Sequence, residues 1–269
     1  IAYGIGTYLS ATGDTDFLVR KGAEMLVETA RLWLALGDYR AETDEFCIHG
    51  VTGPDEYTAL IDNNWYTNRM AQKHLRLARA AVEHARRLDP ARWADTARRI
   101  GFREEELDAF SEAAAAMRLP YDAARDLDAQ DDSFLGKPVW DLAATPADKF
   151  PLLLHYHPMT LYRHQVAKQA DLVLGLVLGG EHVPLERKRR DFDYYDSVTA
   201  HDSTLSACSF SILASEVGRR EQARAHFLAT TLVDVEDRHA NASHGVHMAS
   251  LAGSWLALVT VDIPTGNGS

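Results

Sequence analysis

The sequence has few of the features that are typical of membrane-spanning, secreted and nucleic-acid-binding proteins. It has only two cysteines, Cys47 and Cys208, far apart and flanked by apolar or small residues, which predicts reduced core thiols rather than a disulfide. No apolar run reaches the roughly 18 residues of a transmembrane helix, and no signal peptide is found. Basic runs are missing, and a formal net charge of −11 argues against a nucleic-acid partner. We therefore expect a cytoplasmic protein without membrane or nucleic-acid partners, and a homodimer is possible.

What the chain does have is enough apolar material for one sizeable core, with 46% hydrophobic residues in 269. It opens at Ile1, inside a pattern that is already helical, so we expect a piece of something longer. We expect residues 1–263 to form one helical region, followed by a linker or disordered tail over residues 264–269.

Apolar spacing predicts helices throughout, with few strands. In chain order, we expect them over residues 1–11, 14–36, 64–87, 91–99, 103–117, 172–178, 184–196, 205–217, 219–233 and 248–261. Residues 39–62 are predicted to be irregular, with a short β-ribbon around residues 46–48. A loop of that length in a compact domain is usually functional.

Three of these helices, over residues 172–178, 205–217 and 248–261, are apolar on nearly every side, and this pattern predicts burial on both sides. Amphipathic helices alternate with them, which favours an all-α fold of two concentric layers. A polar cluster precedes each apolar helix. If these helices are the inner ring of a toroid, their N-termini meet at one rim, where the loop that carries Glu56 would join them.

The loop at Glu56 contains the stretch Gly-Val-Thr-Gly-Pro-Asp-Glu-Tyr, followed by Asp-Asn-Asn-Trp-Tyr-Thr-Asn. An acid after a Gly-Pro turn is usually a solvated turn residue. Here Tyr57, Trp65 and Tyr66 lie within ten residues of Glu56, and aromatic rings stack on sugars. An apolar wall of this kind also raises the pKa of a glutamate toward that of a general acid. We therefore expect Glu56 to be partly desolvated.

The polar clusters before the apolar helices also have simpler, purely structural explanations. Lys168 and Gln169 could be solvated first-turn residues. Lysine is unfavourable at the positive end of a helix dipole, however, so we expect Lys168 to have a specific partner. Ser203 and Thr204 could be N-caps. With His201 beside them, however, a helix N-terminus makes a ready anion site.

Two metal interpretations are disfavoured. The histidines His201, His244 and His247 lack a cysteine or carboxylate at zinc-ligand spacing, and the last two could be core histidines. The aspartates of the loop over residues 120–158 lack the spacing of an EF-hand, so we expect them to be solvated. These are Asp122, Asp126, Asp128, Asp131 and Asp132.

The motif around Glu56 resembles the catalytic motif of glycoside hydrolase family 65, which includes maltose, trehalose, kojibiose and nigerose phosphorylases and some hydrolases. The likeness extends to Lys168-Gln169-Ala170-Asp171, to Asp193-Tyr194-Tyr195 with His201-Asp202-Ser203-Thr204-Leu205-Ser206, and to Gly245-x-His247 with Gly253-Ser254-Trp255. It covers essentially the whole chain. The resemblance implies an (α/α)₆ barrel, here incomplete, because the N-terminal β-sandwich and a Trp-Asp pair of the family have no counterpart.

The resemblance implies a role for each motif. Glu56 would be the proton donor. Lys168 and Gln169 would hold the glucose of the −1 subsite, and Trp65 and Tyr57 are further candidates for sugar binding. Phosphate would be bound by His201, Ser203, Thr204, Ser206 and His247.

A phosphorylase needs no second carboxylate, because phosphate is itself an anionic nucleophile. We therefore favour phosphorolysis of an α-linked glucose disaccharide to β-glucose 1-phosphate, with phosphate as co-substrate and no metal or organic cofactor. Asp202 would repel phosphate unless it points away or orients His201. An inverting α-glucoside hydrolase of the trehalase type and a non-catalytic carbohydrate-binding piece remain open, and this stretch alone could be inactive.

Overall fold

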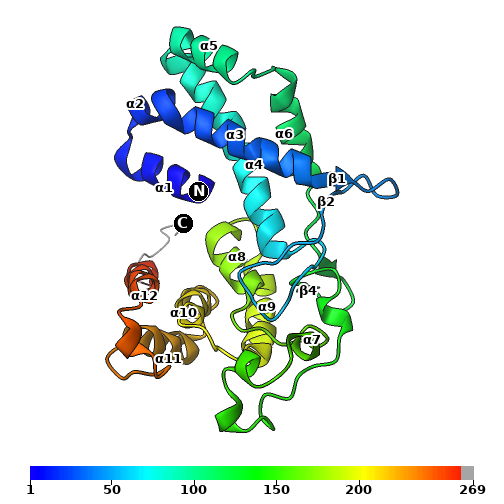
Figure 1. The fold of residues 1–269 in the computed structure, drawn as a ribbon, viewed down its shortest axis with the longest axis vertical. Helices are drawn as coiled ribbons and strands as arrows, with labels where there is room; N and C mark the ends of the chain where they lie inside the picture. The colour runs from blue at the N-terminus through cyan, green and yellow to red at the C-terminus, as the bar shows by residue number, and fades with distance from the viewer. Residues whose placement is uncertain (262–269) are drawn as a thin grey trace, which may run out of the picture. The chain divides into compact units, whose positions relative to one another are not determined.

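The computed structural model describes residues 1–261, which form two compact units (Figure 1). The first unit comprises residues 1–51 and 62–119, and the second begins with residues 52–61 and continues from residue 120. The predicted tail over residues 264–269 lies outside the described residues. Within the described chain, every helix is too short or too polar to cross a membrane.

The first unit is helical with one small ribbon, as the apolar spacing predicts. Its elements are α1 (Ala2–Thr12), α2 (Thr15–Phe17), a π-helical turn (Leu18–Gly22), α3 (Ala23–Leu36), β1 (Gly37–Tyr39), β2 (Phe46–Ile48), α4 (Trp65–Leu88), α5 (Pro90–Arg99) and α6 (Glu105–Ala116). The strands pair antiparallel, with Asp38 opposite Cys47. Asn64 caps α4, where its side chain accepts a hydrogen bond from Thr67 N. The core lies where α3, α4 and α6 pack together.

The second unit carries the clusters of interest and is also mainly helical. Its elements are β3 (Tyr121–Asp122), β4 (Leu127–Asp128), 3₁₀ turns at Phe134–Gly136, Ala147–Lys149 and Leu152–Leu154, α7 (Pro158–Leu161), α8 (Asp171–Gly179), α9 (Leu185–Val198), α10 (Ser206–Glu216), α11 (Arg220–Thr231), a 3₁₀ turn at Ala242–His244 and α12 (Met248–Val261). Figure 1 shows α10, α11 and α12 side by side, and they pack on one another. The all-α expectation is confirmed.

Of the three helices expected to be buried on both sides, α8 and α10 have fully buried apolar residues such as Leu172 and Phe210. The expectation is wrong for α12, where Trp255 is 66% exposed and Met248 is 71% exposed. The reason is that α12 packs on α10 and α11 along one face, which contains the buried Ser250, Ser254 and Ala257. An apolar sequence does not by itself supply a second packing partner.

The aspartate loop also differs from expectation, because Asp128 and Asp131 are buried rather than solvated. Asp128 N–H donates to Asp191 Oδ1 at 3.0 Å, so β4 is joined to α9. Burial, reinforced by the neighbouring Asp128 carboxylate, raises the pKa of Asp191 to about 8. At neutral pH Asp191 is therefore largely protonated.

This protonation predicts a stability effect. Because the native state holds the Asp191 proton more tightly than the unfolded chain, the stability contributed by this group falls as pH rises from about 4 to about 8. Asp191→Asn cannot ionise, so its thermal midpoint relative to wild type should be higher at pH 9 than at pH 5. The control Asp193→Asn, exposed on the same helix, should show no such trend. A relative midpoint for Asp191→Asn that is equal at both pH values would contradict the assignment.

Candidate active site

The loop that carries Glu56 is held in place by its buried neighbour Asp55. Asp55 N–H donates to Asp171 Oδ1 at 2.6 Å, which joins the loop to the first residue of α8. In return, Asp55 Oδ1 accepts from the backbone N–H groups of Lys168 at 2.8 Å and Tyr57 at 3.1 Å, and Oδ2 accepts from Gln130 Nε2 at 2.9 Å. One fully buried carboxyl thus fixes three segments that are distant in sequence.

The charge state of Asp55 follows from opposing effects. Burial raises its pKa to about 6, while backbone N–H donors and the Gln130 amide act in the other direction. At neutral pH the group is therefore mostly ionised and accepts all of these hydrogen bonds. Neither Asp55 nor Gln130 was predicted as a site residue. The only sequence signal for Asp55 is its place beside Glu56, and Gln130 lies in a loop without periodicity.

Glu56 points the other way, into solvent, with 58% of its side chain exposed. The expected desolvation is therefore wrong. Its Oε2 is paired with Nζ of Lys168, whose side chain is 23% exposed. The expected pairing of Lys168 with a specific partner is confirmed. Gln169 donates from Nε2 to Pro54 O at 2.8 Å and so also supports the loop.

The two aromatic residues predicted to bind sugar are buried, Tyr57 at 0% and Trp65 at 1% exposure, so neither offers a free face for stacking. Glu56 is exposed, whereas the neighbouring Tyr57 is directed inward. Its hydroxyl donates to Asp202 Oδ2, and burial followed by this bond raises the pKa of Tyr57 far above its ordinary value. Tyr57 packs with Leu152, Leu161 and Val166, and Trp140 packs against the same cluster.

The Asp202 carboxylate accepts hydrogen bonds from two other segments. Its Oδ2 accepts from Tyr57 and also from Leu152 N at 2.9 Å, so the carboxylate serves the Glu56 loop. The segments before α8 and α10 also lie side by side. Ala167 N donates to Val198 O at 3.0 Å, and Ala200 N donates to Ala167 O at 2.8 Å. Three of the four predicted clusters are thereby connected.

His201 occupies a left-handed backbone conformation, with φ of 55°, which is uncommon for a residue other than glycine. Its Nδ1 lies 2.8 Å from Ser206 Oγ, and its Nε2 lies 3.8 Å from Asp196 Oδ1. Ser206 is fully buried, so its hydroxyl orients His201 instead of facing a ligand. The sequence predicted Ser206 as a direct phosphate ligand, and the buried position of its side chain differs from that prediction.

A pocket of about 300 Å³ opens beside His201, between α10 and α11. Its lining consists of His201, Ser203, Thr204, Ala207, Ala225, His226, Ala229, Thr230, Val233, Arg238 and His239. None of these described lining residues is acidic, whereas several carry hydroxyl, imidazole or guanidinium donors.

The N-cap of α10 is Leu205, so the N-cap alternative for Ser203 and Thr204 is wrong. Ser203 Oγ instead accepts from Leu205 N at 3.2 Å.

His247 precedes α12 and is not among the lining residues of this pocket. Its Nδ1 and its backbone N–H both contact the carboxylate of Asp234, the latter at 2.9 Å. The alternative that His247 is a core histidine is therefore wrong, because its side chain is 22% exposed and pairs with a carboxylate. Burial lowers the pKa of His239, and nearby His247 lowers it further while Asp202 raises it.

Four pocket or cluster residues were missed from sequence: Asp196, His226, Arg238 and His239. His226 lies on α11, where a single histidine in an amphipathic pattern carries no signal. Asp196 Oδ1 lies 3.0 Å from its Nε2. Burial alone would raise the pKa of Asp196, but bonds to His201 and His226 outweigh it and hold the pKa well below its usual range.

Comparisons with known proteins match nearly the whole chain. Residues 1–256 match the family described as the glycosyl hydrolase family 65 central catalytic domain. The chain is 44% identical over 259 residues to α,α-trehalose phosphorylase of Geobacillus stearothermophilus, covering 96% of this chain and 34% of that protein. It is 30% identical to maltose phosphorylase of Bacillus subtilis (strain 168), covering 96% and 33%.

A solved structure from the human microbiome, described as a kojibiose phosphorylase, matches with a TM-score of 0.84 and 29% identity over 96% of this chain and 34% of that one. This match confirms the predicted fold class, that of the all-α (α/α)₆ barrel enzymes. The chain spans about a third of the length of the curated relatives it matches.

Proposed function

Because the chain belongs to glycosyl hydrolase family 65, we propose that it serves the phosphorolysis of an α-linked glucose disaccharide. The products are β-glucose 1-phosphate and a released sugar. Support comes from relatives named as trehalose, maltose and kojibiose phosphorylases, each covered for about a third of its length. The activity proposed is accordingly that of the whole protein.

In this proposal Glu56 is the general acid. Phosphate oxygen attacks the anomeric carbon from one face, the glycosidic C–O bond breaks on the other, and the leaving oxygen takes the Glu56 proton. The Asp55 network supports this role because it fixes the backbone on both sides of Glu56 while leaving the Glu56 side chain exposed. Lys168 orients the carboxyl and, with Gln169, is proposed to hold the glucose. Within residues 1–261, the buried Gln169 Oε1 accepts no hydrogen bond.

Phosphate is proposed to occupy the pocket beside His201. The observation that carries this assignment is that Ser203, Thr204 and His201 line it together with Arg238 and no acid. Asp202, the acid nearest in sequence, is engaged by Tyr57 and Leu152 instead. Ser206 holds His201 in place, and His247 remains a proposed ligand. Charge-assisted hydrogen bonds from such donors are the usual means of binding phosphate.

The proposal also covers cofactors, location and assembly. Catalysis is expected to need no metal or organic cofactor, since phosphate supplies the nucleophile. A cytoplasmic location and a homodimer are further proposals.

The proposed function is tested by assaying the natural full-length protein on a panel of α-linked glucose disaccharides with and without inorganic phosphate. We expect β-glucose 1-phosphate to form on at least one of them, and only when phosphate is added. Free glucose released at the same rate without phosphate would contradict the proposal and indicate an inverting hydrolase. Sugar binding without turnover on any substrate would indicate a non-catalytic binding protein.

A further inference from the structure

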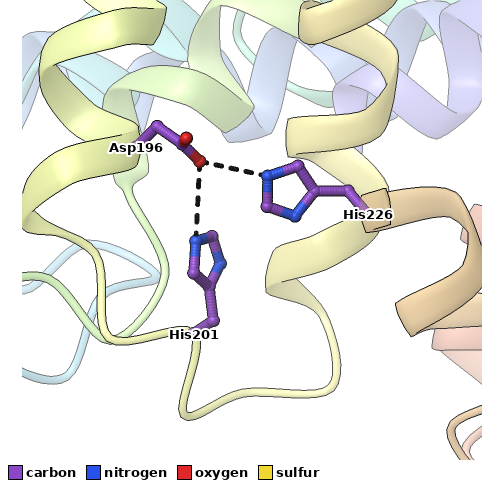
Figure 2. Close-up of side chains that lie close together, drawn as sticks. All are labelled: Asp196, His201 and His226. Atoms are coloured by element: carbon purple, nitrogen blue, oxygen red, sulfur yellow. Dashed lines mark hydrogen bonds and ion pairs between the residues drawn. The ribbon is translucent and has the colours of Figure 1, made fainter. Parts of the chain in front are cut away.

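Three side chains from separate segments converge on one another, as Figure 2 shows, and two of them line the pocket. Asp196 comes from α9, His201 from the loop before α10, and His226 from α11. Asp196 Oδ1 lies 3.0 Å from His226 Nε2 and 3.8 Å from His201 Nε2. Ligand-capable atoms of all three residues fall within 4.8 Å of one another.

These separations fit a small metal ion. A tetrahedral zinc with bonds of roughly 2.0–2.1 Å to nitrogen and oxygen holds its ligand atoms about 3.3 Å apart. The observed separations of 3.0 Å and 3.8 Å lie on either side of that value. An ion could therefore replace the direct contacts with only small side-chain movements.

The second ring nitrogen of His201 supports the same assignment. Histidines that bind metal commonly direct their other nitrogen to an oxygen partner, which fixes the ring and its tautomer. Here Nδ1 of His201 lies 2.8 Å from Oγ of Ser206, a fully buried residue. A proton on Nδ1 donated to this hydroxyl leaves the Nε2 lone pair directed toward the cluster.

The pocket supplies space for a fourth ligand. His201 and His226 both line its volume of about 300 Å³, so an ion bound by the three side chains would have an open position facing that space. Three protein ligands and one open position are typical of non-structural zinc sites. Two imidazoles and one carboxylate favour a transition metal over Mg²⁺ or Ca²⁺, which prefer oxygen ligands.

We propose that Asp196, His201 and His226 form a binding site for a divalent transition metal ion, with Zn²⁺ as the favoured ion. The site goes beyond the proposed function, because phosphorolysis needs no metal. The ion would occupy Nε2 of His201 and so control whether that residue is free to contact an anion in the pocket.

The test measures metal binding directly, without substrate. The natural full-length protein, free of any histidine tag, is stripped with a chelator, dialysed and titrated with ZnCl₂ in a calorimeter. His226→Gln, which can still donate to Asp196, and Asp196→Asn should each weaken binding of one equivalent by at least about ten-fold. The matched control His239→Gln lies in the same pocket outside the cluster, and should bind like wild type.

Co²⁺ provides a second readout that needs no variant to fold. A site of low coordination number gives intense visible absorption bands, unlike the weak bands of the hydrated ion, so wild type should show them with one equivalent of CoCl₂. The proposal is overturned if wild type gives no such bands and no Zn²⁺ binding. It is equally overturned if the two cluster variants bind Zn²⁺ with wild-type affinity. Phosphorolysis assayed in excess chelator should persist in either case, so the two proposals fail independently.

Discussion

Glu56→Gln should lower kcat on an unactivated disaccharide by about 10²-fold or more, the usual scale for loss of a general acid. The amide keeps the shape and hydrogen-bonding capacity of the side chain but has no proton to give to the leaving oxygen. Because the loop is fixed by Asp55 and not by Glu56, the fold and sugar affinity should be retained. Steady-state rates and disaccharide binding are the measurements.

Two controls separate this role from a structural one. On α-glucosyl fluoride with phosphate, the Glu56→Gln variant should lose far less activity, because fluoride leaves with little need of a proton. Glu221→Gln, an exposed glutamate at the start of α11, should behave like wild type on both substrates. A wild-type rate of Glu56→Gln on the disaccharide would remove Glu56 from the mechanism.

His201→Ala should raise KM for phosphate by about 10- to 100-fold, with a much smaller change in KM for the disaccharide. The estimate follows from losing one charge-assisted hydrogen bond of about 1.5–3 kcal/mol in a pocket whose other donors remain. Initial rates over a grid of both substrates give the two constants separately. The assays contain a chelator, so that any metal bound at the same histidine does not contribute.

The exposed histidine His182, in the loop after α8, supplies the matched control, and His182→Ala should leave both constants unchanged. Equal increases in both KM values for His201→Ala would contradict a specific phosphate contact and point to a general disturbance of α10. In a hydrolase, rates would show no dependence on phosphate in either variant.

Much of the architecture follows from local sequence. Apolar spacing and caps placed α4, α11 and α12 within a few residues of their observed ends, because a helix requires only interactions along its own length. The sequence also identified the Glu56 loop and the His201 cluster, since turn-forming and polar residues there interrupt otherwise apolar patterns. It further led us to expect that Lys168 has a specific partner, because its position near a helix N-terminus is electrostatically unfavourable.

Tertiary structure alone decided which side chain faces where. The sequence does not show that Asp55 is the buried anchor and Glu56 the exposed acid, or that Tyr57 turns inward to Asp202. Nor does it show that Asp196, His201 and His226 meet, since each belongs to a different segment. The physical reason is that burial and long-range hydrogen bonds depend on the packing of segments that are as many as 145 residues apart, as Tyr57 and Asp202 are. Local propensity depends on residues only a few positions apart, so it does not determine those long-range partners.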